Sequence, residues 1–324
     1  MSASTQPAVS FEKVYKRFDG KSAVDDLTFH VPRGSVFGLL GPNGAGKTTS
    51  IRMLMTILKP DAGSIRVFGS EPSDALKDRI GYLPEERGLY RGMKVLDNLA
   101  FFGAIHGLAA PEAKRRGREW LSRFRLEDVG ERKLQELSRG NQQKVQFIAA
   151  VLHEPELCVL DEPFSGLDPV NQELMRRTIR ELVSAGSCVI LSTHLMDEVE
   201  RVCTHLTLIS EGRALVTGEL GEVKRRHGTD VVRVEFSGDA TSVAEIPRVR
   251  EVEQIGNTLE IRLETEADPA ELLRALVERI AVRRFEVRAP SLHSIFVQLV
   301  AGERDRGDAS GGTRRFPSAE EVVA

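Results

Sequence analysis

Between about Val9 and Gly218, short apolar runs alternate with longer amphipathic segments. The unbroken apolar runs predict buried strands at Val36–Leu40, Leu157–Asp161 and Cys188–Thr193. Apolar residues at helical spacing predict helices at Thr48–Leu58, Pro111–Arg125, Gln142–Leu152, Val170–Ala185 and Met196–Cys203. A hairpin, Leu206–Ser210 with Arg213–Val216, is expected to close this unit. The alternation is typical of an α/β domain with a mainly parallel sheet.

A different pattern follows Gly218. Glu219–Arg226 predicts a connecting helix with a basic end. Strands are predicted at Val231–Phe236 and Val282–Val287, and a hairpin at Val252–Ile255 and Thr258–Leu263. Helices are predicted from Asp268 to about Ile280 and over Ser291–Val300. We therefore expect a small α+β domain over residues 219–300, with disordered segments at residues 1–8 and 301–324.

Composition narrows the class of protein. The 324 residues suffice for two domains, and 41% hydrophobic with 29% charged residues is typical of a soluble globular protein. A net charge of −3 gives no indication of a nucleic-acid partner. The longest mostly apolar stretch, Asn98–Ala110, is too short to span a bilayer, and Met1–Ser10 does not resemble a secretory signal. The three cysteines lack metal-ligand spacing, which favours buried reduced thiols in the cytosol.

Residues Gly41–Thr48 match the phosphate-loop pattern G-x-x-x-x-G-K-[ST] between a predicted strand and a predicted helix. Glycines let the backbone N–H groups wrap around an anion, and the helix N-terminus adds further donors. Lys47 is expected to reach the β- and γ-phosphates, and the Thr48 hydroxyl to bind Mg²⁺. The expected nucleotide contacts are Gly41, Asn43, Gly44, Ala45, Gly46, Lys47, Thr48 and Thr49. The chain is therefore predicted to bind a nucleoside triphosphate.

Further polar residues follow predicted strands or open predicted helices. Asp161 and Glu162 end an apolar strand, which suits a magnesium ligand and a general base for hydrolysis. Ser138 and Gly140 open a helix and provide a second anion-binding helix terminus. Asp168 follows the carboxylates, and His194 follows the strand Cys188–Thr193.

Taken together, these motifs resemble those of the ATP-binding cassette (ABC) ATPases over about residues 9–218, because six separated motifs occur in the family's order. The resemblance implies a nucleotide-binding domain with a helical subdomain at about residues 88–152, and ATP and Mg²⁺ as cofactors. It implies that Asp161 is the magnesium aspartate and Glu162 the catalytic glutamate. It also implies that Leu137–Asn141 is the signature, Asp168 the D-loop aspartate and His194 the switch histidine. Phe18 fits the aromatic residue that stacks on adenine, and Tyr15 is the competing choice.

This chain departs from the family pattern at two motifs. Arg139 and Asn141 replace a glycine and a glutamine of the usual signature, whereas Ser138 and Gly140 are kept. Glu85 occupies the place of the Q-loop glutamine. Its carboxylate is still expected to reach a magnesium-bound water, which places Glu85 with Thr48 and Asp161 at the metal, while it adds negative charge near ATP.

Within the family, the chain most resembles the ATPase subunits of ABC-2 type exporters. This narrower resemblance rests on the segment Pro84–Tyr90, the sequence after the signature and the C-terminal domain. The sodium-extrusion and daunorubicin-resistance proteins form that branch. The resemblance implies a head-to-tail dimer, with itself or a paralogue, bound through a separate permease at the cytoplasmic face of the membrane. A permease helix is expected between Glu85 and the segment Met93–Phe124, near Arg87, Leu89 and Tyr90. The basic run Lys114–Arg118 is interpreted as a solvated helix face.

Two alternative functions compete with export. A soluble ABC ATPase acting on ribosomes or DNA would need two cassettes, or a long coiled-coil insertion between Thr48 and Ser138, and the sequence has neither. A GTPase or small-molecule kinase would leave the signature unexplained, and the chain has no Asn-Lys-x-Asp guanine motif. The sequence therefore favours an export ATPase that does not bind nucleic acid.

Overall fold

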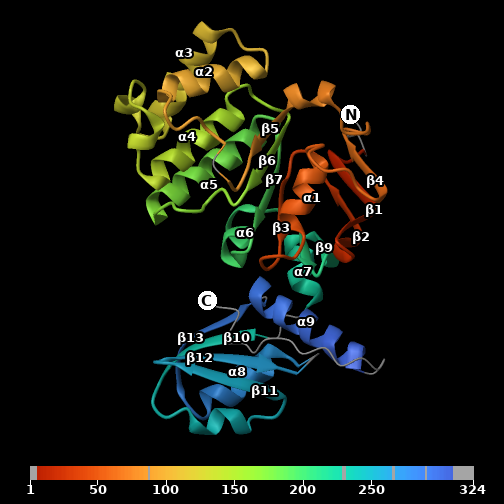
Figure 1. Cartoon of the computed structure of the whole chain (residues 1–324). Helices are drawn as coiled ribbons and strands as arrows, with labels where there is room; N and C mark the ends of the chain where they lie inside the picture. The colour runs from red at the N-terminus through yellow and green to blue at the C-terminus, as the bar shows by residue number, and fades with distance from the viewer. Residues whose placement is uncertain (1–5, 87, 228–230, 265–266, 289, 309–324) are drawn as a thin grey trace, which may run out of the picture. The chain divides into compact units, whose positions relative to one another are not determined.

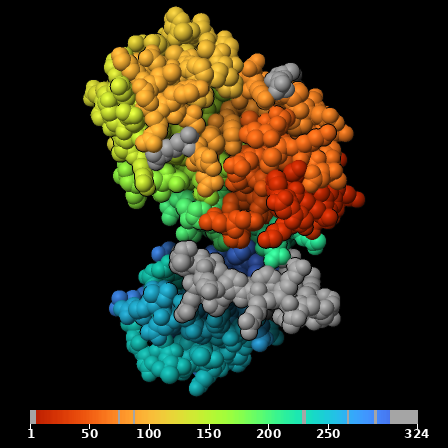
Figure 2. Space-filling view, viewed as in Figure 1, coloured from red at the N-terminus to blue at the C-terminus, as the bar shows by residue number. Residues whose placement is uncertain are grey.

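The computed structural model describes residues 6–86, 88–227, 231–264, 267–288 and 290–308. The chain divides into two compact units, Met1–Leu220 and Gly221–Ala324 (Figure 1). Figure 2 shows the surfaces of the same two units. Within the described ranges, no helix has both the length and the apolar character needed to cross a membrane.

A six-stranded sheet forms the centre of the first unit, in the order β5-β6-β7-β3-β8-β9. Its strands are β3 (Val36–Leu40), β5 (Ile80–Leu83), β6 (Leu157–Asp161), β7 (Cys188–Thr193), β8 (His205–Ser210) and β9 (Arg213–Glu219). All pairs are parallel except β8 with β9. Every residue of β3, β6 and β7 is buried, which explains their unbroken apolar sequences. The three strands predicted from those sequences are confirmed.

A second, antiparallel sheet in this unit was not predicted. Its order is β2-β1-β4, with β1 at Val9–Phe18, β2 at Lys21–Val31 and β4 at Ala62–Val67. Stacked rings of Phe11, Phe29 and Phe37 join it to β3, with centroid separations of 4.5 and 5.4 Å. The expectation of disorder over residues 1–8 is wrong at Ala8. This residue is fully buried, and its N–H donates to the carbonyl of Val31 at 2.8 Å.

The described residues of the first unit form six α-helices. They are α1 (Lys47–Leu54), α2 (Val95–Ile105), α3 (Ala110–Arg123), α4 (Arg139–Val151), α5 (Pro169–Ser184) and α6 (Met196–Val202). Short 3-10 turns occur at Asp74–Arg79, Glu127–Val129 and Leu134–Glu136. Helix α1 ends earlier than predicted, because Thr56 takes a left-handed φ of 59° and the chain folds back. Helices α2, α3 and α4 gather at one end of the unit as a helical subdomain (Figure 1).

The second unit is a four-stranded antiparallel sheet with helices, in agreement with the predicted α+β domain. Its strand order is β11-β12-β10-β13. The strands are β10 (Val231–Ser237), β11 (Val249–Ile255), β12 (Thr258–Leu263) and β13 (Ala281–Arg288). The helices are α7 (Leu220–Arg226), α8 (Pro269–Val277) and α9 (Leu292–Asp308), with a 3-10 turn at Thr241–Glu245. Disorder from Ala301 was expected, but α9 continues to Asp308.

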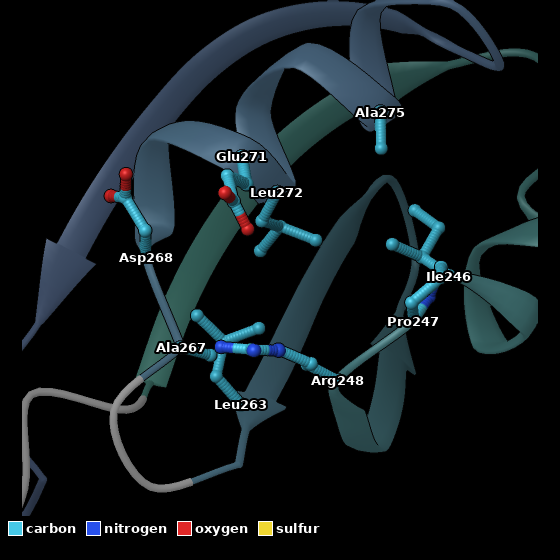
Figure 3. A pocket seen from close by; sticks show the side chains of 9 residues that line it. All are labelled: Ile246, Pro247, Arg248, Leu263, Ala267, Asp268, Glu271, Leu272 and Ala275. Carbon is cyan, nitrogen blue, oxygen red and sulfur yellow. The ribbon is translucent and has the colours of Figure 1, made fainter.

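Helix α8 packs on this sheet through Leu272 and Leu276, which share a buried cluster with residues of β10 and β12. Beside the helix lies a shallow hollow with an apolar floor that includes Leu263 and Leu272. Arg248 extends across it, and Glu271 projects from α8 at its rim (Figure 3). The hollow is therefore lined by both apolar and charged side chains, all of them from the second unit.

Candidate nucleotide site

The phosphate loop leaves β3 and ends on α1. Gly46, at the helix N-cap, has a φ of 105°, and a Cβ atom there would lie 2.5 Å from the carbonyl oxygen of Ala23. Both the left-handed backbone and this close approach require glycine. The N–H of Ala45 donates to the carbonyl of Pro42 at 3.2 Å, which closes the turn. The loop thus lies between a strand and a helix, as predicted for the segments on either side of the motif.

Lys47 is folded back into the phosphate loop. Its Nζ atom donates to the carbonyl oxygens of Gly41 at 2.6 Å and Pro42 at 3.0 Å. Burial lowers the pKa of Lys47, while the nearby carboxylates of Glu162, Asp161 and Glu85 act in the opposite direction. The ammonium group therefore lies within the field of three of the acidic residues that were predicted for the site, Glu85, Asp161 and Glu162.

Asp161, at the end of β6, is 1% exposed. Its Oδ1 atom accepts a hydrogen bond from Ser192 on β7, and its Oδ2 atom is buried without a partner among the described residues. Burial raises the pKa of Asp161, and hydrogen bonding from Ser192 and Thr48 lowers it in part. A buried carboxylate oxygen with an open coordination position beside a threonine hydroxyl fits a hard divalent cation.

Glu162 has a left-handed φ of 48°, a rare conformation that is often found at functional sites. Its carboxylate accepts hydrogen bonds at Oε1 from the N–H of His194 at 3.1 Å and at Oε2 from Thr193 Oγ1 at 3.1 Å. The Nδ1 atom of His194 lies 2.8 Å from Oε1. The Glu162 side chain is 12% exposed and that of His194 is 47% exposed. The carboxylate is therefore fixed, and the imidazole is open to a ligand.

The signature and the D-loop aspartate lie at two helix N-termini. Ser138 caps α4, with its Oγ accepting from the N–H of Asn141 at 3.3 Å. Asp168 caps α5, with Oδ1 accepting from the N–H groups of Val170 and Asn171, each at 3.0 Å. The two termini are adjacent, since a Cβ atom on Gly140 would lie 3.0 Å from the carbonyl of Gly166.

The structure distinguishes the two aromatic candidates. Phe18 is an exposed residue at the end of β1, paired with Lys21 on the hairpin whose Ala23 touches the phosphate loop. The Tyr15 hydroxyl is hydrogen-bonded to Asp26. The pKa of Tyr15 is raised, mainly by burial and to a smaller extent by this hydrogen bond. The geometry therefore favours Phe18 for stacking. Glu85 is exposed just after β5, close enough to influence the pKa values of Lys47 and Asp161.

Two supporting residues were not identified from the sequence. Ser192 donates to Asp161, and Thr193 donates to Glu162, both from the end of β7. Their only sequence signal is a pair of polar residues that ends an otherwise apolar strand before His194. The neighbouring parallel strand brings them to the acidic residues, and local spacing does not reveal such a contact.

Two family profiles match the chain. The profile described as ABC transporter matches residues 24–165. The profile described as the C-terminal domain of DrrA1-3-like ATP-binding proteins matches residues 218–300. The first profile therefore matches part of the first unit, and the second matches most of the second unit.

Curated relatives match along nearly their whole length. An uncharacterized ABC transporter ATP-binding protein, YhaQ of Bacillus subtilis, is 40% identical over 90% of this chain and 98% of its own. The daunorubicin/doxorubicin resistance ATP-binding protein DrrA of Streptomyces peucetius is 36% identical over 93% and 96%. The Nod factor export ATP-binding protein I of Paraburkholderia xenovorans is 35% identical over 92% and 98%.

A solved structure of the ATP-binding subunit of an ABC transporter is 30% identical. It covers 68% of this chain and 93% of its own length, with a TM-score of 0.64. This structure agrees with the fold of the first unit, and the three relatives match 90–93% of the chain. The chain belongs to the ABC transporter ATP-binding proteins, and is an ABC transporter ATPase with a DrrA-like C-terminal domain.

Proposed function

We propose that this chain is the ATP-hydrolysing subunit of an ABC-2 type exporter and acts with a separate permease. The observation that carries the proposal is the fixed Glu162 carboxylate, held by Thr193 and His194 beside the phosphate-loop lysine. Two relatives are named for drug resistance and for Nod factor export, which supports export over other roles.

The site residues are assigned as follows. Residues Gly41–Thr49 surround the phosphates of ATP, and Phe18 stacks on adenine. Thr48 and Asp161 hold Mg²⁺, with Glu85 in reach directly or through water. A magnesium ion bound with nucleotide draws further ligands from phosphates and water, so two or three protein oxygens suffice. The ion supplies charge neutralisation on the phosphate oxygens.

Hydrolysis of ATP needs a base that takes a proton from the attacking water, and a γ-phosphate that is held in place. Glu162 accepts a proton from a water molecule as the water oxygen bonds to the γ-phosphorus. The bond between that phosphorus and the β,γ-bridging oxygen breaks, and ADP leaves with the electron pair. Lys47 stabilises the phosphate charge, and His194, which is exposed next to Glu162, contacts the γ-phosphate.

A head-to-tail dimer gives each nucleotide a second anion site. One chain carries two helix N-termini suited to anions, at Lys47 and at Ser138. One triphosphate cannot occupy both on the same chain, so Ser138 and Gly140 contact the γ-phosphate held by the partner, and Asp168 lies at the interface. The partner is a second copy or a paralogue. Loss of the γ-phosphate removes the link and opens the dimer.

An exposed aromatic patch on the helical subdomain supports permease binding. Tyr90 and Phe101, which are 52% and 39% exposed, form an edge-to-face pair with centroids 5.2 Å apart. Asn98 fixes the loop, accepting from the N–H of Tyr90 at 2.9 Å and donating to its carbonyl at 3.0 Å. Leu89 is buried rather than available as a contact, and Arg87 lies outside the described residues. Two exposed aromatic side chains held in place in this way offer apolar contact area to a permease helix.

The test couples the chain to its candidate permease. The chain is co-expressed with a polytopic membrane protein encoded beside it, and ATP-dependent transport and ATPase stimulation are measured in inverted vesicles. We expect stimulation that is lost on Tyr90→Ala with Phe101→Ala, and enzyme held at the cytoplasmic face. Stimulation by ribosomes or DNA, with none by the permease, would instead support the non-transport alternative.

A further inference from the structure

Helix α4 carries two glutamines one turn apart that contact the loops of the acidic residues. The Nε2 atom of Gln146 lies 3.0 Å from the carbonyl oxygen of Pro84 and 3.1 Å from that of Glu86. The Nε2 atom of Gln143 lies 3.3 Å from the carbonyl oxygens of both Glu162 and Pro163. Residues three positions apart lie on the same helix face. One face of α4 therefore holds both loops.

Each glutamine amide donates to a pair of loop carbonyls just beyond a strand, and of these four the Glu162 carbonyl also accepts from the N–H of Ser165 at 3.2 Å. Pro84 and Glu86 flank Glu85 just beyond the end of β5, and Glu162 and Pro163 lie just beyond β6. An NH₂ group has two donors, so one side chain can serve two acceptors. Gln146 is 4% exposed, so water has little access to replace it.

The same helix begins at the signature. Ser138 caps α4, and Gln143 and Gln146 are the fifth and eighth residues of the helix. An α-helix is stiff over this length, so its N-terminus cannot shift without moving the two amides. A displacement at Ser138 therefore reaches Glu162 and Glu85 through hydrogen bonds to their own loops.

We propose that Gln146, together with Gln143, is a positioning residue that sets the places of Glu85 and Glu162 according to the position of the signature helix. The inference rests on the proposed role of Ser138 as a nucleotide contact. Engagement of Ser138 moves α4 and brings the two carboxylates into the geometry for hydrolysis. Gln146 itself does not touch the nucleotide.

The variant Gln146→Met keeps the length of the side chain and removes both donors. A shift of about 1 Å in a reacting group can cost up to about 100-fold in rate, so we expect kcat to fall by about tenfold. The affinity for ATP should stay within about twofold, because the phosphate loop is untouched. Amide hydrogen exchange over residues 80–86 should become faster, since the loop loses its tether.

The experiment compares full-length Gln146→Met and Gln143→Met with Gln254→Met. Gln254 also donates its amide to a backbone carbonyl, that of Gly256 at 3.1 Å, but it is an exposed residue of β11 in the second unit. The control should match the unmodified chain in kcat and exchange. Unchanged exchange over residues 80–86 together with unchanged kcat in Gln146→Met would overturn the inference. A chain that hydrolyses no ATP at all, but still shows faster exchange in Gln146→Met, would instead refute the proposed function.

Discussion

The Nδ1 atom of His194 lies 2.8 Å from Oε1 of Glu162, and the two residues directly follow adjacent parallel strands, β7 and β6. The N–H of His194 and the hydroxyl of Thr193 bind the same carboxylate. The contact fixes the ring through Nδ1 and leaves the exposed Nε2 edge available to a phosphate oxygen. The same contacts therefore orient both the proposed base, Glu162, and the proposed phosphate contact, His194.

Lys47→Ala should abolish nucleotide binding. The ammonium group is the cation that the phosphate loop encloses, and alanine removes it without altering the glycines. Lys59→Ala, at an exposed position beyond α1, is the matched control. Titration with a fluorescent ATP analogue should show at least about a hundredfold weaker binding for Lys47→Ala alone. Equal affinities of Lys47→Ala and the unmodified chain would contradict the assigned phosphate loop.

Ser138→Ala should weaken hydrolysis while leaving ATP bound to isolated monomers. The hydroxyl caps α4 in its own chain and contacts the nucleotide of the partner in the proposed dimer. Part of the effect is loss of the cap, worth about 1 kcal/mol of stability. Ser138→Asn keeps a capping oxygen and separates this effect from loss of the contact. If Ser138→Ala monomers no longer bound ATP, the cross-subunit role would be refuted.

Substitutions at the two members of a buried ion pair, Arg176 and Glu198, should have strongly non-additive effects on the free energy of unfolding. Arg176 on α5 donates to Glu198 on α6 at 2.6 Å, and their side chains are 5% and 10% exposed. Arg176→Met leaves an unpaired buried carboxylate and should cost about 3 kcal/mol. Adding Glu198→Leu removes that charge and should restore much of the loss. Thermal denaturation of both variants tests this, and a double variant less stable than Arg176→Met would count against it.

Acidification should destabilise the fold through a stacked histidine pair. The ring centroids of His106 and His153 are 3.8 Å apart, and the angle between the ring planes is 4°. Neither ring nitrogen of His153 has a hydrogen-bond partner among the described residues. Burial, and then the charge of His106, lowers the pKa of His153 from 6.5 to about 4. Burial also lowers the pKa of His106, against a smaller opposite effect of Asp78.

Because the unfolded chain takes up the proton first, stability is complete above about pH 6.5 and falls as pH decreases toward 4. Between pH 7 and pH 5 the loss should be about 2 kcal/mol. Denaturation midpoints measured across this range should fall less steeply for His153→Leu. An identical slope in the two proteins would show that the pair does not titrate as proposed.

The central strands were predictable because burial on both faces requires continuous apolar sequence. The strands β1 and β2 were not, since bulges interrupt their pairing and Lys13 and Asp26 take left-handed φ angles of 49° and 51°. Such irregularities break the alternation on which strand prediction depends. The end of α1 was misplaced for a related reason, the left-handed Thr56.

Some residues of the candidate site were predictable from the sequence, and others were not. The phosphate loop, the strand-end carboxylates and the helix caps have local signals in spacing and residue type. Ser192, Gln143 and Gln146 act through contacts with segments distant in sequence. A polar residue in a buried strand or helix does not indicate which loop it will meet. These contacts required the three-dimensional arrangement.

The most direct test of the account is ATP binding and hydrolysis by Glu162→Gln, measured side by side with the unmodified chain. The amide keeps the shape of the side chain but cannot accept the proton, so turnover should fall by at least about a hundredfold. Binding of Mg-ATP should persist, and the nucleotide should hold the protein in a closed dimer. Turnover of Mg-ATP at the rate of the unmodified chain would contradict the assignment of Glu162 as the base.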